Sequence, residues 1–301
     1  MPAWPARFIG VALFTVAASP AFAQAGEPLR DDAGRPVLIA SPAVRIVALA
    51  PSLTELVFAA GAGDRLVGVS AYSDYPAEAR RLPEVADAVG ISWESLLALK
   101  PDLVLAWKGG TRAADISRLD GLGVKVFVIE VRQLADVARA LRVIGKLAGR
   151  PVPAEHAADV FQRQLAALRE ANAGKLTVKT FFEISAKPLM TINRDHVIAE
   201  MISLCGGRNV FGDAAGLVSE PSREELLARG PEAILFGRSS GDAKHAGKSV
   251  YDGLPAAREG RVFGITADYA LRPGPRLLLA AAEICDALDR SRASMKATVA
   301  R

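Results

Sequence analysis

The sequence lacks the concentrated positive charge that a nucleic-acid-binding surface requires. Its 37 Lys and Arg side chains against 33 Asp and Glu give a formal net charge of only +4, and no five like charges follow one another. An electrostatic footprint for DNA or RNA needs a basic patch or stripe. The charge pattern therefore argues against nucleic acid as a partner.

Histidine is scarce, which argues against a resident metal ion or cofactor. The three histidines are His156, His196 and His245, and no two are four residues apart. A structural zinc site takes four ligands, so we expect each histidine to be a solvated side chain. A haem site stays open, because one axial His, Tyr, Met or Cys suffices.

Long apolar runs are missing beyond the N-terminus, so no transmembrane helix is expected. Arg7, the apolar residues 8–18 and the Ala-Phe-Ala triplet before Gln24 have the pattern of a secretory signal peptide. We predict a signal peptide over residues 1–23, a mobile leader over 24–43 and a soluble exported protein. Cleavage removes one charge, Arg7, and lowers the formal net charge from +4 to +3.

Cysteine is also scarce, and Cys205 and Cys285 allow a single pairing. In an oxidising compartment a disulfide is the expected state. Two buried free thiols are the alternative. A catalytic cysteine is disfavoured, because the nearest histidine, His196, lies at the far end of the helix predicted to carry Cys205.

An internal echo indicates two related halves. Residues 94–107 read ESLLALKPDLVLAW, and residues 224–237 read EELLARGPEAILFG. In each copy a helical pattern ends at a proline and a short apolar run typical of a buried strand follows. Two such units far apart predict two similar lobes with a ligand-binding cleft between them.

Strands and helices alternate along most of the chain, as in a parallel α/β sheet. Residues 134–173 differ, because they hold two helical patterns with no strand between them. We predict two similar α/β lobes with mainly parallel sheets, joined by one long helix. The expected boundaries are 44–152 for the N-terminal lobe, 153–174 for the interdomain helix and 175–301 for the C-terminal lobe.

Aromatic residues follow several predicted strands, at the edge where open α/β sheets bind ligands. These are Tyr72, Trp107 and Tyr269, with Asp268 and Arg272 as polar neighbours. Aromatic faces there predict a large, flat, partly apolar ligand. The alternative is that these rings only cap the core of each lobe.

Two further patterns concern partners and catalysis. Glu94 and Glu224 occupy equivalent places in the two copies, so they could dock onto arginine pockets of a partner or simply favour a helix dipole. Residues 237–241 read GRSSG and fit a serine-hydrolase motif, but no helix pattern follows and only His245 lies downstream. A surface loop is the preferred interpretation.

These residues are where the chain resembles the periplasmic substrate-binding proteins of ABC importers, and most of all the cobalamin (vitamin B12)-binding proteins. The specific stretches are SAYSDYP at 70–76, LKPDLVLAWKGG at 99–110, CGG at 205–207 and SRE at 222–224. The resemblance covers about residues 45–288 and implies two α/β lobes joined by a long helix.

The resemblance also implies roles for individual residues. Tyr72 and Trp107 would pack against a cobalt corrinoid, and Asp268 and Arg272 would line the far lobe. Glu94 and Glu224 would dock onto arginines of a dimeric membrane permease, and Cys205 and Cys285 would form a disulfide. The protein itself would be a non-catalytic monomer that closes little on its ligand.

The chain departs from the family where family members have aromatic residues. It has Ala88, Ile184, Val218 and Ala270 at or near such positions, and Tyr269 replaces a tryptophan. The predicted ligand is therefore cobalamin or a related corrinoid such as cobinamide. A ferric siderophore, for which Lys108, Arg112 and Arg272 could serve, or haem is the alternative within the class, and an exported serine hydrolase is the alternative outside it.

Overall fold

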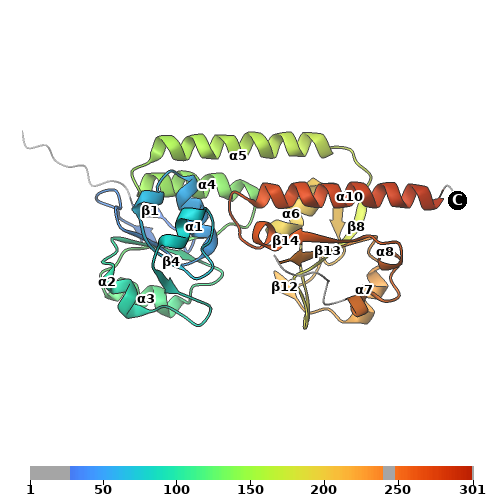
Figure 1. Ribbon diagram of the computed structural model, residues 1–301, viewed down its shortest axis with the longest axis horizontal. Coiled ribbons are helices and arrows are strands. Elements are labelled where there is room, and N and C mark those ends of the chain that lie inside the picture. Colours follow the sequence, from blue (N-terminus) through green and yellow to red (C-terminus); the bar gives the residue numbers. More distant parts are fainter. Residues whose placement is uncertain (1–27, 240–247, 300–301) are drawn as a thin grey trace, which may run out of the picture.

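The computed structural model describes residues 28–239 and 248–299. It has two α/β lobes side by side, joined along one long edge by helices (Figure 1). The lobes have separate central sheets, and every pairing between strands within those two sheets is parallel. The predicted fold class is confirmed.

The N-terminal lobe is built on a five-stranded sheet in the order β5 (Glu84–Ala86), β4 (Leu66–Ser70), β3 (Ile46–Ala48), β6 (Leu103–Trp107), β7 (Val126–Ile129). Alternate strand residues face opposite sides. Residues such as Ile46 and Leu105 pack with α1 (Pro51–Ala59) and α4 (Leu134–Leu147). Val47 and Val104 pack on the other side with α2 (Trp93–Ala98) and α3 (Ala113–Gly121).

The C-terminal lobe repeats this plan with the order β11 (Gly207–Asn209), β8 (Val178–Glu183), β13 (Ala233–Arg238), β14 (Val262–Thr266). Helices α6 (Val197–Leu204) and α10 (Leu277–Val299) cover one face. Helices α7 (Arg223–Arg229) and α8 (Pro255–Arg258) contribute to the cluster on the other face. A small antiparallel sheet of β9 (Ser185–Ala186), β10 (Leu189–Ile192) and β12 (Val218–Ser219) was not predicted.

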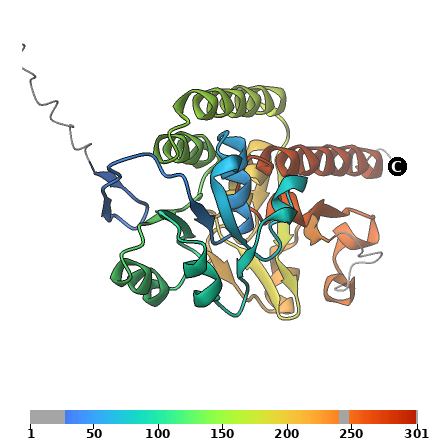
Figure 2. The ribbon, with the colours of Figure 1, turned by 60° about the vertical axis from the view of Figure 1, so that its left-hand side comes forward.

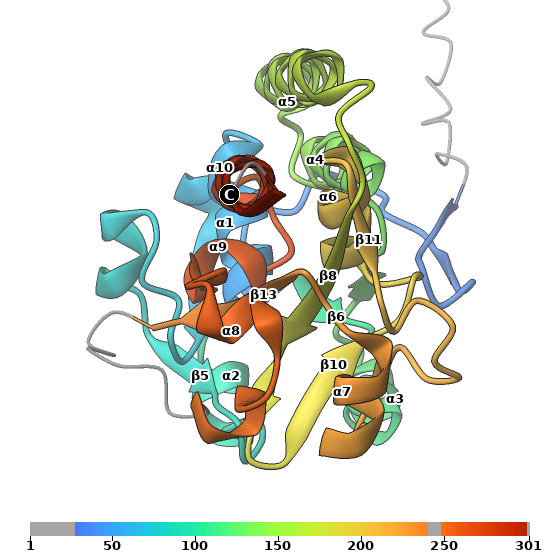
Figure 3. The same ribbon diagram turned by 90° about the vertical axis from the view of Figure 1, so that its right-hand side faces the viewer.

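The helix predicted over 153–174 is α5 (Pro151–Asn172), which runs over both lobes (Figure 1). Its 22 residues correspond to about 33 Å of helix. Proline in its first turn suits a helix start, where the missing N–H has no intrahelical partner. Seen end-on, α5 forms the outermost layer, with α4 and α10 beneath it (Figure 3).

The two lobes share one hydrophobic cluster below α5. It contains Leu141 and Ile144 of α4, Phe161 of α5, Ile198 of α6 and Ile284 of α10. Protein interiors of this kind are close-packed, so a displacement of one side chain is transmitted to its neighbours. The lobes are therefore joined by packed side chains as well as by the chain itself.

Residues 28–43 are not the irregular leader that we expected. Residues 29–37 form a hairpin, β1 (Leu29–Arg30) with β2 (Pro36–Val37), at the outer edge of the N-terminal lobe, and residues 38–43 form no helix or strand (Figure 2). Asp31 and Asp32 accept hydrogen bonds from the backbone of Val128 and Glu130 beside β7. These contacts attach the segment to the edge of the sheet; residues 24–27 lie outside the described residues.

Among residues 28–239 and 248–299, no helix has the length and apolar character needed to cross a bilayer.

Candidate functional site

A cavity of about 140 Å³ lies between the two lobes. The N-terminal lobe lines it with Trp107, Gly109 and residues 130–132. The C-terminal lobe lines it with residues 195–197, Leu217 and residues 270, 271 and 273. The β6 strand, the start of α6 and the loop after α9 (Ala267–Ala270) therefore converge on one site from distant parts of the sequence.

Trp107 ends β6 and is the aromatic wall of the cavity. Its side chain is 37% exposed, and the two glycines that follow make room for the ring. A Cβ on Gly109 would lie 2.8 Å from the indole, and one on Gly110 would lie 2.4 Å from it. Thr111 Oγ1 accepts a hydrogen bond from the Trp107 N–H, which fixes the turn.

Aliphatic side chains supply the remaining apolar surface. Leu217 and Leu271, which are 43% and 42% exposed, line the cavity with Val131 and Val197. The sequence analysis missed all four. Val131, Leu217 and Leu271 lie in connecting segments, where no periodic pattern marks a side chain as ligand-facing.

Glu130 is an ionised polar group at the cavity wall. Its carboxylate lies 3.0 Å from Lys108 Nζ and 2.8 Å from Arg132 Nε. Burial raises the pKa of Glu130, but the hydrogen bonds from Lys108 and Arg132 outweigh burial and hold the pKa below its ordinary value. The site therefore keeps a compensated negative charge.

His196 lies at the cavity too, which corrects the expectation of a solvated side chain. It is the N-cap of α6, and its Nδ1 accepts a hydrogen bond from the Ile198 N–H at 3.2 Å. Burial lowers the pKa of His196 to about 4, so the ring is neutral near pH 7. Of the other two histidines, His156 is exposed on α5 and His245 lies outside the described residues.

Beside the cavity, charged residues connect the lobes in an arrangement that we call the interlobe clasp, made of Glu55, Asp74, Asp268, Arg272 and Arg276. Arg272 lies 2.5 Å from Asp74 and 2.9 Å from Asp268. Arg276 donates two hydrogen bonds to the buried Glu55, at 2.6 and 2.8 Å. The clasp therefore ties α1 and the loop after β4 to the segment between α9 and α10.

Two tyrosines pack against the clasp. The Arg276 guanidinium lies 4.3 Å from the centre of the Tyr75 ring and 5.2 Å from that of Tyr269. These distances suit cation–π contacts. Tyr269, predicted as a ligand-binding residue, thus faces an arginine of its own chain.

The five predicted ligand-binding residues, all within the described part, do not share one surface. Trp107 lines the cavity, while Asp268, Tyr269 and Arg272 take part in or pack on the clasp. Tyr72 is 76% exposed in the loop after β4, with a left-handed φ of 63°. Their roles toward a ligand stay predictions.

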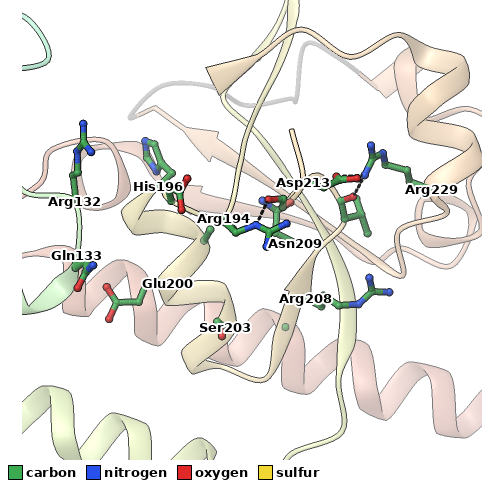
Figure 4. Close-up of a pocket in the computed structure, with 15 residues that line it drawn as sticks. Arg132, Gln133, Arg194, His196, Glu200, Ser203, Arg208, Asn209, Asp213 and Arg229 are labelled. Carbon is green, nitrogen blue, oxygen red and sulfur yellow. Dashed lines mark hydrogen bonds and ion pairs between the residues drawn. The ribbon is translucent and has the colours of Figure 1, made fainter. Parts of the chain in front are cut away.

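The cavity continues into a larger groove of about 930 Å³ on one flank of the C-terminal lobe. Arg132, Asp195 and His196 line both spaces. From there the groove follows α6 and β11, passes Arg208 and reaches Arg229 (Figure 4). Arg229 is paired with Asp213, so only part of this positive charge is uncompensated.

Glu94 and Glu224 are exposed in the first turns of α2 and α7. Both helices lie on the side of the molecule away from α5, one in each lobe (Figure 1). The Ser222 hydroxyl caps α7 by accepting from the Glu225 N–H at 3.0 Å. The two carboxylates are therefore presented on equivalent elements, as the internal echo predicts.

Cys205 and Cys285 are joined by a disulfide, with their Cα atoms 4.7 Å apart. The bond connects the C-cap of α6 to α10. Arg292 donates hydrogen bonds to the carbonyl oxygens of Cys205 and Gly206 beside it. The alternative of two free thiols is wrong for this structure.

The hydrolase-like motif begins with Gly237 and Arg238, the last two residues of β13, and Ser239 after them is exposed. Residues 240–247, which hold the rest of the motif and His245, lie outside the described residues. The described residues contain no group of three or more His, Cys, Asp or Glu side chains arranged to hold a metal ion.

Residues 46–269 match the sequence model of a periplasmic binding protein family. The chain belongs to this periplasmic binding protein family. It is 36% identical over 246 residues to a vitamin B12-binding protein of Pectobacterium carotovorum, covering 81% of this chain and 88% of that protein.

Solved structures show the same fold. The periplasmic vitamin B12-binding protein BtuF of Vibrio cholerae aligns with a TM-score of 0.77 and 34% identity, covering 83% of this chain and 98% of that one. The periplasmic heme-binding protein BhuT in complex with two hemes aligns with a TM-score of 0.72 and 26% identity, covering 82% and 100%. Solved structures with this fold thus include a vitamin B12-binding protein and a heme-binding protein.

Proposed function

We propose that this protein is a periplasmic receptor that captures cobalamin or a related corrinoid between its lobes and delivers it to an ABC importer. The observation that carries the proposal is the interlobe cavity walled by Trp107, in a chain that shares 36% identity with a vitamin B12-binding protein over most of its length. An indole face and aliphatic side chains suit the apolar face of a macrocycle.

The proposal extends to export and delivery. Residues 1–23 act as the signal peptide, and the mature protein is a monomer without catalytic activity. Glu94 and Glu224 dock onto arginines of the permease dimer, one from each lobe. Supporting this, both glutamates are exposed on equivalent helices of the two lobes.

Titration of the purified protein with cyanocobalamin tests the ligand assignment. We expect saturable binding at micromolar concentration or below and a change in the corrinoid visible spectrum. Trp107→Ala is expected to weaken binding by about 10-fold, since a stacked aromatic contributes about 0.5–1.5 kcal/mol beyond its area. Trp93→Ala is the matched control, because Trp93 lies on α2, packs under Arg118 of α3 and does not line the cavity. No detectable binding at micromolar concentration would exclude a cobalamin receptor.

Haem is the second candidate, favoured by the similarity to a heme-binding protein. Hemin titrated under the same conditions separates the two. Tight binding of hemin with no binding of cyanocobalamin would replace the corrinoid proposal.

A further inference from the structure

The start of α6 places one hydrogen-bonding group in the cavity that the proposed function does not yet use. His196 lines both the interlobe cavity and the groove that continues from it. Figure 4 shows its side chain at the end of the groove that Arg132 also lines. The residue comes from the C-terminal lobe and stands across the cavity from Trp107 and Glu130 of the N-terminal lobe.

The N-cap contact fixes which ring nitrogen carries the proton. Nδ1 accepts the Ile198 N–H at 3.2 Å, so it holds a lone pair and no hydrogen. A neutral imidazole has one N–H, which must then be on Nε2. The neutral state follows from burial, which lowers the pKa of the ring to about 4.

Nε2–H is available to a ligand. Within residues 28–239 and 248–299, Nε2 has no hydrogen-bond partner, and it is absent from the set of buried side-chain atoms that lack one. An apolar ligand that covers a polar N–H at a cavity wall breaks the hydrogen bond of that N–H to water. This costs binding free energy unless the ligand supplies an acceptor. The occupant should therefore present an oxygen to this point.

This arrangement also argues against metal coordination. To bind a metal, Nε2 must have a free lone pair, so its proton would move to Nδ1 and the cap of α6 would be lost. An N-cap contributes about 1 kcal/mol. A carbonyl oxygen from an amide side chain of a corrinoid accepts the N–H with no such cost.

We propose that His196 donates its Nε2–H to an amide carbonyl at the rim of the bound corrinoid and does not coordinate the cobalt. This rests on the proposed function. It makes His196 a specificity residue that selects ligands with a neutral acceptor at this position.

The decisive variant is His196→Asn. The Asn Oδ1 occupies the place of Nδ1 and keeps the cap of α6, whereas the Nε2–H is removed and the Asn amide N–H groups, in the place of Cδ2, do not extend as far into the cavity. His156→Asn on the exposed face of α5 is the matched control. The probes are cyanocobalamin and diaquacobinamide, whose cobalt has exchangeable axial positions.

We expect His196→Asn to lower the binding affinity for both corrinoids by about 3- to 10-fold, the range for one neutral hydrogen bond. The unfolding midpoint should be unchanged, and the visible spectrum of bound diaquacobinamide should be the same in wild type and variant. His196→Ala, which also loses the cap, should weaken binding at least as much and lower the midpoint.

Three outcomes would overturn the inference. Unchanged affinity in His196→Asn would show that no hydrogen bond forms. A spectral shift of diaquacobinamide on wild-type protein that the variant abolishes would show that His196 coordinates cobalt. If the wild type binds neither corrinoid, the proposed function fails and the inference with it, whereas the first two results leave the proposed function intact.

Discussion

The position of the Trp107 ring depends on the absence of side chains at Gly109 and Gly110. Gly110→Ala would place a Cβ 2.4 Å from the indole, so the ring must move. We expect a several-fold loss of corrinoid affinity and a shift in tryptophan fluorescence, with little change in stability because the site is exposed. Gly121→Ala, whose Cβ would meet nothing within 4 Å, is the control and should behave as wild type. Equal affinity in both variants would show that the ring position does not matter.

Glu130 makes a prediction about acid stability. Its pKa is depressed in the folded protein, so its contribution is present above the ordinary value of 4.5 and is lost as pH falls through the folded pKa. At pH 7 we expect Glu130→Gln to lower the free energy of unfolding by about 1 kcal/mol, because the ion pairs are partly solvated. Denaturant unfolding from pH 7 to pH 3 should show the two proteins converging at the acid end. A difference that persists at pH 3 would contradict the assignment.

At this scale the sequence predicted some of the site and missed the rest for identifiable reasons. Trp107 could be predicted because a strand ends at it and strand ends gather at the ligand edge of an α/β sheet. His196 could not, since a histidine after a polar turn has no local signal that a second lobe covers it. Arg272 was predicted to face a ligand, but its partner Asp74 lies almost 200 residues earlier in the sequence, so the ion pair has no local signal.

At the scale of helices and strands, the sequence predicted those elements whose buried residues recur at regular spacing. Apolar residues at helical spacing predict helices over residues 134–147 and 197–204, and short apolar runs predict strands over 66–70 and 103–107; these ranges are α4, α6, β4 and β6. The apolar pattern of the last helix predicts an end near residue 288, yet α10 continues to Val299. Past that point its apolar face thins, and contacts such as Arg292 with the backbone of residues 205 and 206 support it instead.

The hairpin of residues 29–37 shows the opposite limit. Its strands are two residues each, too short for a periodic pattern. What holds it is non-local: Asp31 and Asp32 accept backbone hydrogen bonds beside β7, and Arg139 of α4 pairs with Asp32 at 2.8 Å. A polar composition therefore predicted an irregular leader where side-chain carboxylates in fact cap a sheet edge.

Helix α5 gives a prediction for the element that bridges the lobes. Gln164 is exposed near its middle, so Gln164→Ala should be neutral or slightly stabilising. Gln164→Pro removes an internal hydrogen bond and kinks the helix, at a cost of about 3 kcal/mol. We expect a lower melting temperature, a broader distribution of interlobe distances in small-angle scattering and weaker corrinoid binding. A proline variant with wild-type scattering and affinity would show that α5 does not hold the lobes in place.

For the whole molecule, two separate devices set how the lobes are related. On the side of α5, one hydrophobic cluster passes through α4, α6 and α10 without a break. On the side of α9, the interlobe clasp joins Glu55 to Arg276 and Asp74 to Arg272. A hinge motion would have to disrupt both, so we expect the two lobes to change their relative positions little when a ligand binds.

The clasp gives the last prediction, because Glu55 is only 2% exposed and depends on Arg276 for compensation. Burial already raises the pKa of Glu55 despite the opposing hydrogen bonds from Arg276. Arg276→Met leaves the buried Glu55 carboxylate without hydrogen bonds from an arginine, with only Arg272 nearby at 3.8 Å, which should lower the free energy of unfolding by about 3–5 kcal/mol at pH 7.5.

The pH dependence and the double variant separate this cause from lost packing. With its folded pKa raised further, Glu55 in Arg276→Met is protonated at low pH, so the variant should be most stable below that pKa and lose stability as pH rises through it. Glu55→Gln combined with Arg276→Met removes the charge and should recover much of the loss at pH 7.5. If the double variant is no more stable than Arg276→Met, the Tyr75 and Tyr269 contacts of Arg276 carry the effect, and the ion pair is not what holds the two lobes together on this side.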